Sequence, residues 1–193
     1  MDRAVQIFAS HQEAELATLA YYRSLTPAQR LDILFYLIAR AHETDHAAQQ
    51  GLREFIASLN SHKVEYVIVG GYALAYHGSP RYTGNIDIFL RVSPDNAARV
   101  EGVIRDFGFS SLGLSARDFC DANQVVQLGH PPNRVDLITS LSGVTFEEAW
   151  AGREAADVDG LPVHFIGRRA FVKNKRATGR LKDQADLEAL GEV

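Results

Sequence analysis

The stretch from Val67 to Leu90, VIVGGYALAYHGSPRYTGNIDIFL, decides the fold of this 193-residue chain. Its β-branched start predicts a strand that stops at Gly70 and Gly71. A short helix follows, and the alternation from Ile86 to Val92 predicts a second strand, which carries Asp87. Glycine lets backbone N–H groups approach a ligand, and a helix N-terminus favours an anion. The glycine turn is therefore a candidate phosphate site, although a Gly-Gly pair alone also suits a tight turn.

Helices and strands are predicted on both sides of this stretch. Residues 1–62 are predicted to be helical, with a capping box and a proline at the first helical position in Thr26-Pro27-Ala28-Gln29. The remaining pattern predicts, in chain order, strand 64–69, helix 72–77, strand 86–92, a helix from Pro94 to near Gly108, strands 124–128 and 134–138, a helix opened by a capping box at Thr145, strand 161–166, and C-terminal helices from 168 with a break at Gly179. Interleaved helices and strands indicate an α/β or α+β fold. We divide the chain into a helical N-terminal appendage (1–62) and a mixed-sheet domain (63–193).

Composition excludes several classes of protein. A hydrophobic fraction of 46% is ordinary for a globular chain, and the net charge of -4 says little about partners. The single cysteine, Cys120, excludes an internal disulfide framework and a cysteine-rich zinc site, and it fits a reducing compartment. The start of the chain lacks a signal-peptide pattern, and no apolar run approaches about 18 residues without charges. We therefore expect a cytoplasmic protein that does not cross a membrane.

Basic residues concentrate in one segment near the C-terminus. Residues 168–182 contain no acidic side chain and seven basic ones: Arg168, Arg169, Lys173, Lys175, Arg176, Arg180 and Lys182. Such a segment attracts phosphates, and a solvated basic helix is the equally good alternative.

Asp87 and Asp136 are candidate ligands for a cation. Asp136 lies in Arg134-Val135-Asp136-Leu137-Ile138, where apolar neighbours make an unpaired carboxylate costly. Two strand-borne carboxylates that converge would bind Mg²⁺, a hard cation that also takes phosphate oxygens. The alternative for Asp136 is a salt bridge, with Arg134 as its partner.

The sequence from Val64 to Leu190 resembles the nucleotidyltransferase superfamily that includes DNA polymerase β. The pattern of that superfamily is a hydrophobic residue followed by Gly-Gly or Gly-Ser, a spacer, Asp-x-Asp on a strand, and a third Asp on a later strand. Within the superfamily, the chain is most similar to the abortive-infection toxin (AbiEii-type) nucleotidyltransferases, which end in Lys-x3-Gly-Arg-x-Lys-Asp-x2-Asp. The matching residues are Lys175, Gly179, Arg180, Lys182, Asp183 and Asp186, and the segment His77–Thr83 resembles the stretch that leads to the metal-binding strand.

The resemblance implies an activity and a set of site residues. The activity would be transfer of NMP from an NTP to a hydroxyl of tRNA or of a protein, with release of pyrophosphate, in a toxin that has a cognate antitoxin. The cofactor would be Mg²⁺ or Mn²⁺, held by Asp87 and Asp136 with Asn85. The implied nucleotide-binding residues are Gly70, Gly71, Arg81, Thr83, Lys175, Arg180 and Lys182. Lys182 and Asp183 would join Asp87 and Asp136 as catalytic residues, with Asp183 as a general base or a supporting residue.

Asn85 departs from the pattern, because the family has its first metal-binding Asp at this position. An amide oxygen can ligate a cation but carries no charge, so we expect weaker cation binding and slower turnover. A tolerated variant with a weakened site, a degenerate binder and an engineered knockout all explain it. The rival function is therefore a nucleotide- or RNA-binding module that performs no chemistry.

Other motifs point to other chemistry. His42-Glu43-Thr44-Asp45-His46 fits the zinc-protease pattern H-E-x-x-H. The charge of Asp45, the polar surroundings and the lack of a clear third ligand favour a solvated helix surface instead. Nothing near Cys120 suggests a paired base. Aromatic side chains that stack on RNA bases would be Tyr72, Tyr76 and Tyr82, which core packing explains equally well.

Overall fold

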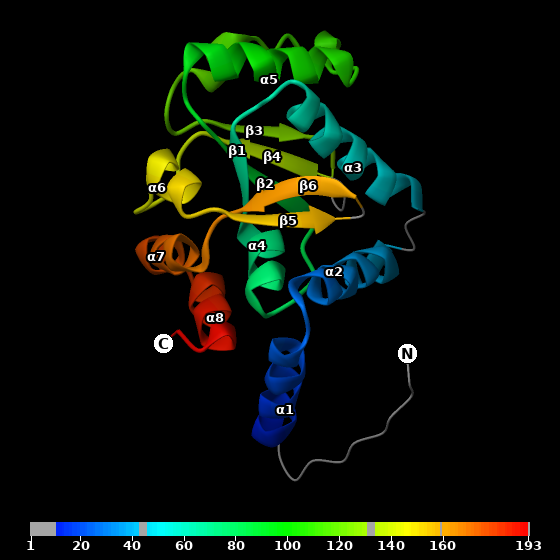
Figure 1. Ribbon diagram of the computed structural model, residues 1–193, viewed down its shortest axis with the longest axis vertical. Helices are drawn as coiled ribbons and strands as arrows, with labels where there is room; N and C mark the ends of the chain where they lie inside the picture. Colours follow the sequence, from blue (N-terminus) through cyan, green and yellow to red (C-terminus); the bar gives the residue numbers. More distant parts are fainter. Residues whose placement is uncertain (1–10, 43–45, 131–133, 159, 193) are drawn as a thin grey trace.

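The computed structural model describes residues 11–42, 46–130, 134–158 and 160–192 (Figure 1). A six-stranded mixed sheet runs in the order β3-β4-β2-β1-β6-β5. Its strands are β1 (Tyr66–Val69), β2 (Asn85–Leu90), β3 (Val125–Leu128), β4 (Arg134–Ile138), β5 (Glu154–Val158) and β6 (Leu161–Phe165). The pairs β2–β4 and β1–β6 are parallel, and the other three pairs are antiparallel. The predicted mixed α/β architecture is confirmed.

The described part of the chain contains eight α-helices. They are α1 (His11–Ser24), α2 (Pro27–His42), α3 (His46–Ser61), α4 (Gly70–His77), α5 (Pro94–Asp106), α6 (Phe146–Ala151), α7 (Arg168–Thr178) and α8 (Leu181–Leu190), with two short 3-10 turns, η1 (Ser110–Leu112) and η2 (Ala116–Phe119). None of these helices is long and apolar enough to cross a bilayer. Residues 43–45 of the H-E-x-x-H motif lie outside the described residues, so the structure does not address that motif.

The local signals in the sequence mark the helix ends correctly. The Thr26 hydroxyl accepts from the backbone N–H of Gln29 at 3.2 Å, and the Gln29 side chain accepts from Thr26 N–H at 2.9 Å. Thr145 accepts from Glu148 N–H at 3.1 Å in the same way. Gly179 adopts φ +66° between α7 and α8, which is the left-handed cap expected of a helix-ending glycine.

Strand β5 was missed by the sequence pattern. Its residues, EAADV, include only one β-branched side chain. The strand forms because it pairs in antiparallel register with β6 along five residue pairs. Pairing with a neighbouring strand, rather than local propensity, decides this element.

Helices α2 and α3 share the hydrophobic core of the sheet. Leu34 from α2 and Phe55 and Leu59 from α3 are at most 1% exposed and belong to the same buried cluster as the strands β1 and β2. The division of the chain at residues 62 and 63 into two folding units stays a prediction.

The register of β2 and β4 positions the polar residues of interest. Asn85 pairs with Arg134 and Asp87 pairs with Asp136. Because side chains alternate along a strand, these four residues share one face of the sheet. Ile86 points to the other face, where it lines an apolar cavity of about 480 Å³ between the sheet and helices α2 and α3.

Candidate functional site

Two carboxylates and one amide form the centre of the site. The Asn85 Nδ2 group donates to Asp87 Oδ1 and to Asp136 Oδ2, at 2.9 Å in each case. The Asn85 Oδ1 atom accepts from the Thr83 hydroxyl at 3.3 Å. This amide orientation follows from the partners, because ionised carboxylates only accept hydrogen bonds. The two carboxylates therefore converge on a single point, which the Asn85 NH₂ group occupies.

The surroundings of Asp87 disfavour the ionised form of its carboxylate. Burial, and then the charge of Asp136, raise the pKa of Asp87 to about 6, although the Asn85 hydrogen bond and the charges of Lys175 and Lys182 act in the opposite direction. Two like charges in a partly dry site disfavour joint ionisation. A cation placed between Asp87 and Asp136 would relieve this repulsion.

Asp136 has the salt bridge that the sequence offered as its alternative role. Arg134 donates from Nε to Asp136 Oδ1 at 2.7 Å and from Nη2 to Oδ2 at 2.9 Å. Gln127, its neighbour on β3, donates to Oδ2 at 3.3 Å. The salt bridge and the shared site with Asp87 are both present, so the two interpretations of Asp136 are compatible.

The glycine pair allows other groups to approach closely. Gly70 adopts φ +63°, and a Cβ at this position would lie 2.0 Å from Asp87 Oδ2. A Cβ on Gly71 would lie 3.0 Å from the Thr83 side chain. The turn from β1 into α4 therefore packs its backbone directly against the side chains that form the site.

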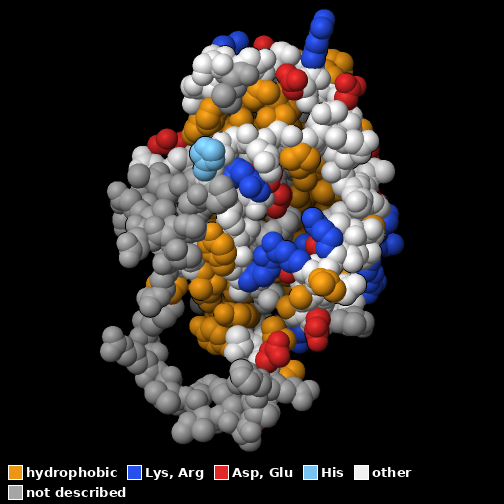
Figure 2. Space-filling model, turned by 180° about the vertical axis from the view of Figure 1, so that it is seen from behind, with side chains coloured by type: hydrophobic (Ala, Val, Ile, Leu, Met, Phe, Trp, Pro, Cys, Tyr) orange, Lys and Arg blue, Asp and Glu red, His pale blue; other side chains and the backbone are white. Residues whose placement is uncertain are grey.

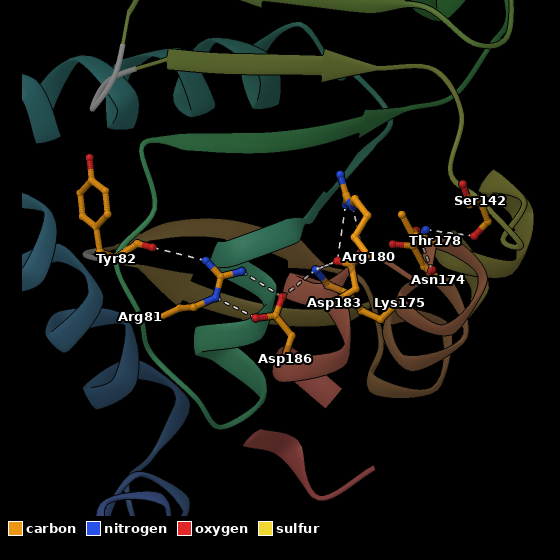
Figure 3. Close-up of polar contacts among 9 residues, drawn as sticks. All are labelled: Arg81, Tyr82, Ser142, Asn174, Lys175, Thr178, Arg180, Asp183 and Asp186. Atoms are coloured by element: carbon orange, nitrogen blue, oxygen red, sulfur yellow. Dashed lines mark hydrogen bonds and ion pairs between the residues drawn. The ribbon is translucent and has the colours of Figure 1, made fainter. Parts of the chain in front are cut away.

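The C-terminal motif forms a network of ion pairs (Figure 3). Lys175 from α7 is 6% exposed and contacts Asp183 Oδ1 at 2.6 Å and Asp186 Oδ2 at 2.7 Å, both on α8. Arg81 binds both oxygens of Asp186, at 2.8 and 2.9 Å. Arg180 binds Asp183 Oδ2 at 2.7 Å. The network ties the segment before β2 to the two C-terminal helices.

The carboxylates of this network stay ionised. Burial acts to raise the pKa of Asp183, but hydrogen bonds from Arg180 and Lys175 hold this pKa below its usual range. The pKa of Asp186 is lowered in the same way, against the effect of burial, by Arg81 and Lys175. A carboxylate with a lowered pKa and cationic partners is a poor proton acceptor at neutral pH.

Most of the basic segment is used within the protein. Figure 2 shows Lys and Arg side chains in the middle of one face with Asp and Glu side chains among them. Five of the seven basic residues contact acidic side chains or a backbone carbonyl: Arg168 with Glu192, Lys173 with Glu148, Lys175 with Asp183 and Asp186, Arg176 with the Glu192 carbonyl, and Arg180 with Asp183.

Lys182 differs from the other members of the motif. It is exposed and makes no ion pair with any described residue, including Asp186, its expected partner one turn along the helix. Burial of its amine, and then the charges of Arg81 and Lys175, lower the pKa of Lys182, while Asp186 and Asp87 partly oppose them. Lys182 is therefore a cation near Asp87 that is available to a ligand.

The tyrosines near the site separate into two groups. Tyr72 and Tyr76 are buried in the core, whereas Tyr82 is 41% exposed. Tyr82 lies next to Arg81, and its carbonyl accepts from Arg81 Nη1 at 3.3 Å. Only Tyr82 of these three is placed where it could meet a base.

The residues present fit one divalent cation with a reduced set of ligands. Among the described residues, no three His, Cys, Asp or Glu side chains form a group that could hold a metal ion. Asp87 and Asp136 nevertheless aim oxygens at one point, and Asn85 would present its oxygen there if its amide turned over. Two carboxylates, an amide oxygen and water are ligands that Mg²⁺ accepts.

The site residues predicted from the sequence did not include Arg134 and Gln127. Arg134 appeared only as a salt-bridge partner, and Gln127 did not appear. The signal for Arg134 was available, because it precedes Asp136 by two positions and must share its face of β4. Gln127 is placed by the register of β3 against β4, which the sequence does not display.

No family model matches this chain, and no curated protein does. Among solved structures, the chain is similar to an antigenic nucleotidyltransferase-like protein from Paracoccidioides brasiliensis, with 16% identity over 75% of this chain and 74% of that one and a TM-score of 0.48. It is also similar to a candidate nucleotidyltransferase from Thermotoga maritima, with 14% identity over 72% of this chain and 89% of that one and a TM-score of 0.49.

Proposed function

We propose that this chain is a nucleotidyltransferase, which moves NMP from an NTP to an acceptor hydroxyl and releases pyrophosphate. The observation that supports it best is the convergence of Asp87 and Asp136, in register on adjacent parallel strands, on one point 2.9 Å from each. A glycine turn packs against Asp87, and an available lysine, Lys182, lies near it. A triphosphate is bound by three kinds of group: carboxylates that hold a cation, a backbone turn that contacts the phosphates, and a cationic side chain.

The reaction assigns a step to Asp87. The acceptor oxygen attacks the α-phosphorus, the bond from that phosphorus to the β-phosphate oxygen breaks, and pyrophosphate leaves. The acceptor proton passes to the Asp87 carboxylate, which a bound cation would keep ionised and therefore able to accept it. A bound Mg²⁺ or Mn²⁺ would offset the charge that develops on the phosphate oxygens.

Several other residues act through contacts with the phosphates or with each other. The backbone of Gly70 and Gly71 and the amine of Lys182 contact the triphosphate in this proposal. Arg180, whose side chain is 71% exposed, joins them at the rim. The buried Lys175, with Arg81, acts as a positioning residue, because both hold the α8 carboxylates.

Thr83 and Asp183 have supporting roles in this proposal. Thr83 orients the Asn85 amide through its hydroxyl. Asp183, which is 0% exposed between Lys175 and Arg180, holds these cations in place rather than serving as the base.

The acceptor and the biological role rest on the resemblance of residues 175–186 to AbiEii-type toxins. We propose a tRNA or protein hydroxyl as the acceptor, and a cognate antitoxin as a partner in the cytoplasm. The exposed Tyr82 beside the site favours an acceptor with a base to stack, which places RNA ahead of protein.

A second candidate function has its own support. Asn85 fills the centre of the site with a hydrogen-bond donor, where the family pattern has a carboxylate. A protein in this state could hold a nucleotide or RNA and perform no chemistry. Binding without transfer is the result that separates this module from an enzyme.

The deciding experiment is label transfer from each α-³²P-labelled NTP, with Mg²⁺ and then Mn²⁺, to total tRNA or to a cell extract. We expect label on an RNA or protein acceptor and loss of transfer in Asp87→Asn, which keeps the shape of the side chain. The matched control is Arg91→Gln, which alters an ion-paired arginine at the other end of β2. Nucleotide binding without transfer under any condition would support the binding module.

A further inference from the structure

Arg134 and its neighbours donate several hydrogen bonds to one of the two carboxylates, Asp136. A carboxylate offers about four lone-pair positions. Asp136 accepts four hydrogen bonds: from Arg134 Nε on Oδ1, and from Arg134 Nη2, Asn85 Nδ2 and Gln127 Nε2 on Oδ2. Three of these donors share Oδ2, so a cation that bridges this oxygen and Asp87 takes the place of Asn85 Nδ2 and meets the Arg134 guanidinium on the same carboxylate.

The charges of the site also make Arg134 the residue that opposes a cation. Asp87 and Asp136 bring two negative charges, Arg134 brings one positive charge, and Asn85 brings none. Arg134 is the first residue of β4 and its side chain is 28% exposed, so its guanidinium can leave for solvent or for a phosphate without disturbing the core. Asp136, at 8% side-chain exposure, cannot move in the same way.

We propose that Arg134 is an internal competitor of the divalent cation: its guanidinium pairs with Asp136 in the free protein, and this positive charge weakens the binding of a cation between Asp136 and Asp87. This inference rests on the proposed function, because it takes the pair of Asp87 and Asp136 as the cation site. Like charges repel more strongly in a partly buried site than in water. The guanidinium on Asp136 therefore lowers the affinity of the free protein for a divalent cation.

The competing explanation is that Arg134 only stabilises the fold. Under that explanation, removal of Arg134 lowers stability and leaves cation affinity unchanged or weaker. Under the competitor proposal, removal of Arg134 frees Asp136 and raises cation affinity. The two explanations therefore predict opposite changes in one binding measurement, which needs neither nucleotide nor activity.

The experiment titrates the protein with Mn²⁺ in the absence of nucleotide and follows free Mn²⁺ by electron paramagnetic resonance. We expect Arg134→Gln to bind Mn²⁺ at least about tenfold more tightly than wild type. Arg134→Lys keeps the charge but loses the two-point contact, so a smaller gain is expected. Arg91→Gln is the matched control, since Arg91 also pairs with carboxylates, those of Glu65 and Glu147. The Mn²⁺ affinity of this variant should equal that of wild type.

A thermal readout accompanies the titration. Added Mn²⁺ stabilises the folded state by RT ln(1 + [Mn²⁺]/Kd), so at one Mn²⁺ concentration the rise in Tm should be larger in Arg134→Gln than in wild type. If Arg134→Gln does not fold, the Arg134→Lys comparison decides, and an affinity no higher than wild type overturns the proposal.

The Asn85→Asp variant separates failure of this inference from failure of the proposed function. If Asn85→Asp binds Mn²⁺ while Arg134→Gln binds no more tightly than wild type, the cation site stands and the competitor role is wrong. If wild type and all variants fail to bind Mn²⁺, the cation site and the competitor role are both overturned.

Discussion

At the scale of single residues, Asn85 joins two carboxylates through one amide nitrogen. Asn85→Asp replaces that donor with a third carboxylate, so the free protein should lose stability while a cation is bound more tightly. We predict a gain of at least about tenfold in nucleotidyl transfer, or about 1.4 kcal/mol of barrier, measured as pyrophosphate release with Mg²⁺ and then Mn²⁺. Equal turnover of the two proteins would show that Asn85 is a working ligand.

Gly70 provides a second test at this scale. Gly70→Ala combines a left-handed backbone, which costs about 1–2 kcal/mol, with a Cβ placed 2.0 Å from Asp87 Oδ2. Gly113→Ala is the matched control, because Gly113 has φ +69° and open space around its Cβ position. In urea unfolding, Gly70→Ala should lose at least about 1 kcal/mol more than Gly113→Ala, since overpacking adds to strain. Equal losses would mean that the Asp87 side chain moves aside freely.

The raised pKa of Asp87 predicts a pH dependence of stability in the absence of metal. This pKa is about 6 in the folded protein, against 3.8 for an aspartate in the unfolded chain. The folded state therefore holds its proton more tightly, and the contribution of Asp87 to stability, fully present below pH 3.8, is lost as pH rises through 6. Asp87→Asn should become more stable than wild type by up to about 3 kcal/mol between pH 4 and 7.

Urea unfolding of both proteins in a chelator, at pH 4, 5, 6 and 7, measures this difference. Asp183 and Asp186, whose pKa values are lowered, are present in both proteins, so their effect cancels. A difference between the two proteins that does not change with pH would contradict the raised pKa.

At the scale of elements, the contact between α7 and α8 depends on one buried lysine. Lys175→Met would leave Asp183 and Asp186, at 0% and 2% exposure, with one fewer cation, and removal of one partner from a buried ion pair costs about 3–5 kcal/mol. Lys182→Met removes an exposed amine without an ion pair, so stability should change by less than about 0.5 kcal/mol.

The same pair of variants separates structural from ligand-binding lysines. Loss of a charge-assisted contact from Lys182 should weaken NTP affinity by at least about tenfold. Urea unfolding and NTP titration by calorimetry give both quantities for each protein. A destabilised Lys182→Met with unchanged NTP affinity would make the whole C-terminal motif structural.

At the scale of the whole molecule, helices α2 and α3 cover one side of the sheet. Leu34, Phe55 and Leu59 are almost fully buried there, and each contributes about 1.5–3 kcal/mol of a total stability near 5–15 kcal/mol. A chain of residues 63–193 should therefore bind a hydrophobic dye and lack a cooperative unfolding transition. A chain of residues 25–193, which lacks α1 and the residues before it but keeps α2 and α3, is the control and should unfold cooperatively. Cooperative unfolding of 63–193 would show that the two segments are independent domains.

The sequence by itself determined the elements whose causes lie within a few residues. The alternation of 86–92, the run that ends at Gly70, and the capping boxes at Thr26 and Thr145 each act through neighbours one turn or one strand apart. The strand at Arg134–Ile138 was predicted with the bounds that the structure shows. Asp87 and Asp136 were selected for the same reason, since a carboxylate among apolar strand residues must find a partner.

Only the tertiary structure decided which partners these side chains meet. The approach of Asp136 to Asp87 requires β4 to pair with β2 in a particular register, and β5 exists because β6 lies beside it. Lys175 appeared to be a phosphate ligand, yet the packing of α8 on α7 places two carboxylates on it. The physical reason is that backbone hydrogen bonds and side-chain periodicity act over short stretches of chain. The partner of a charge depends on which distant elements pack together.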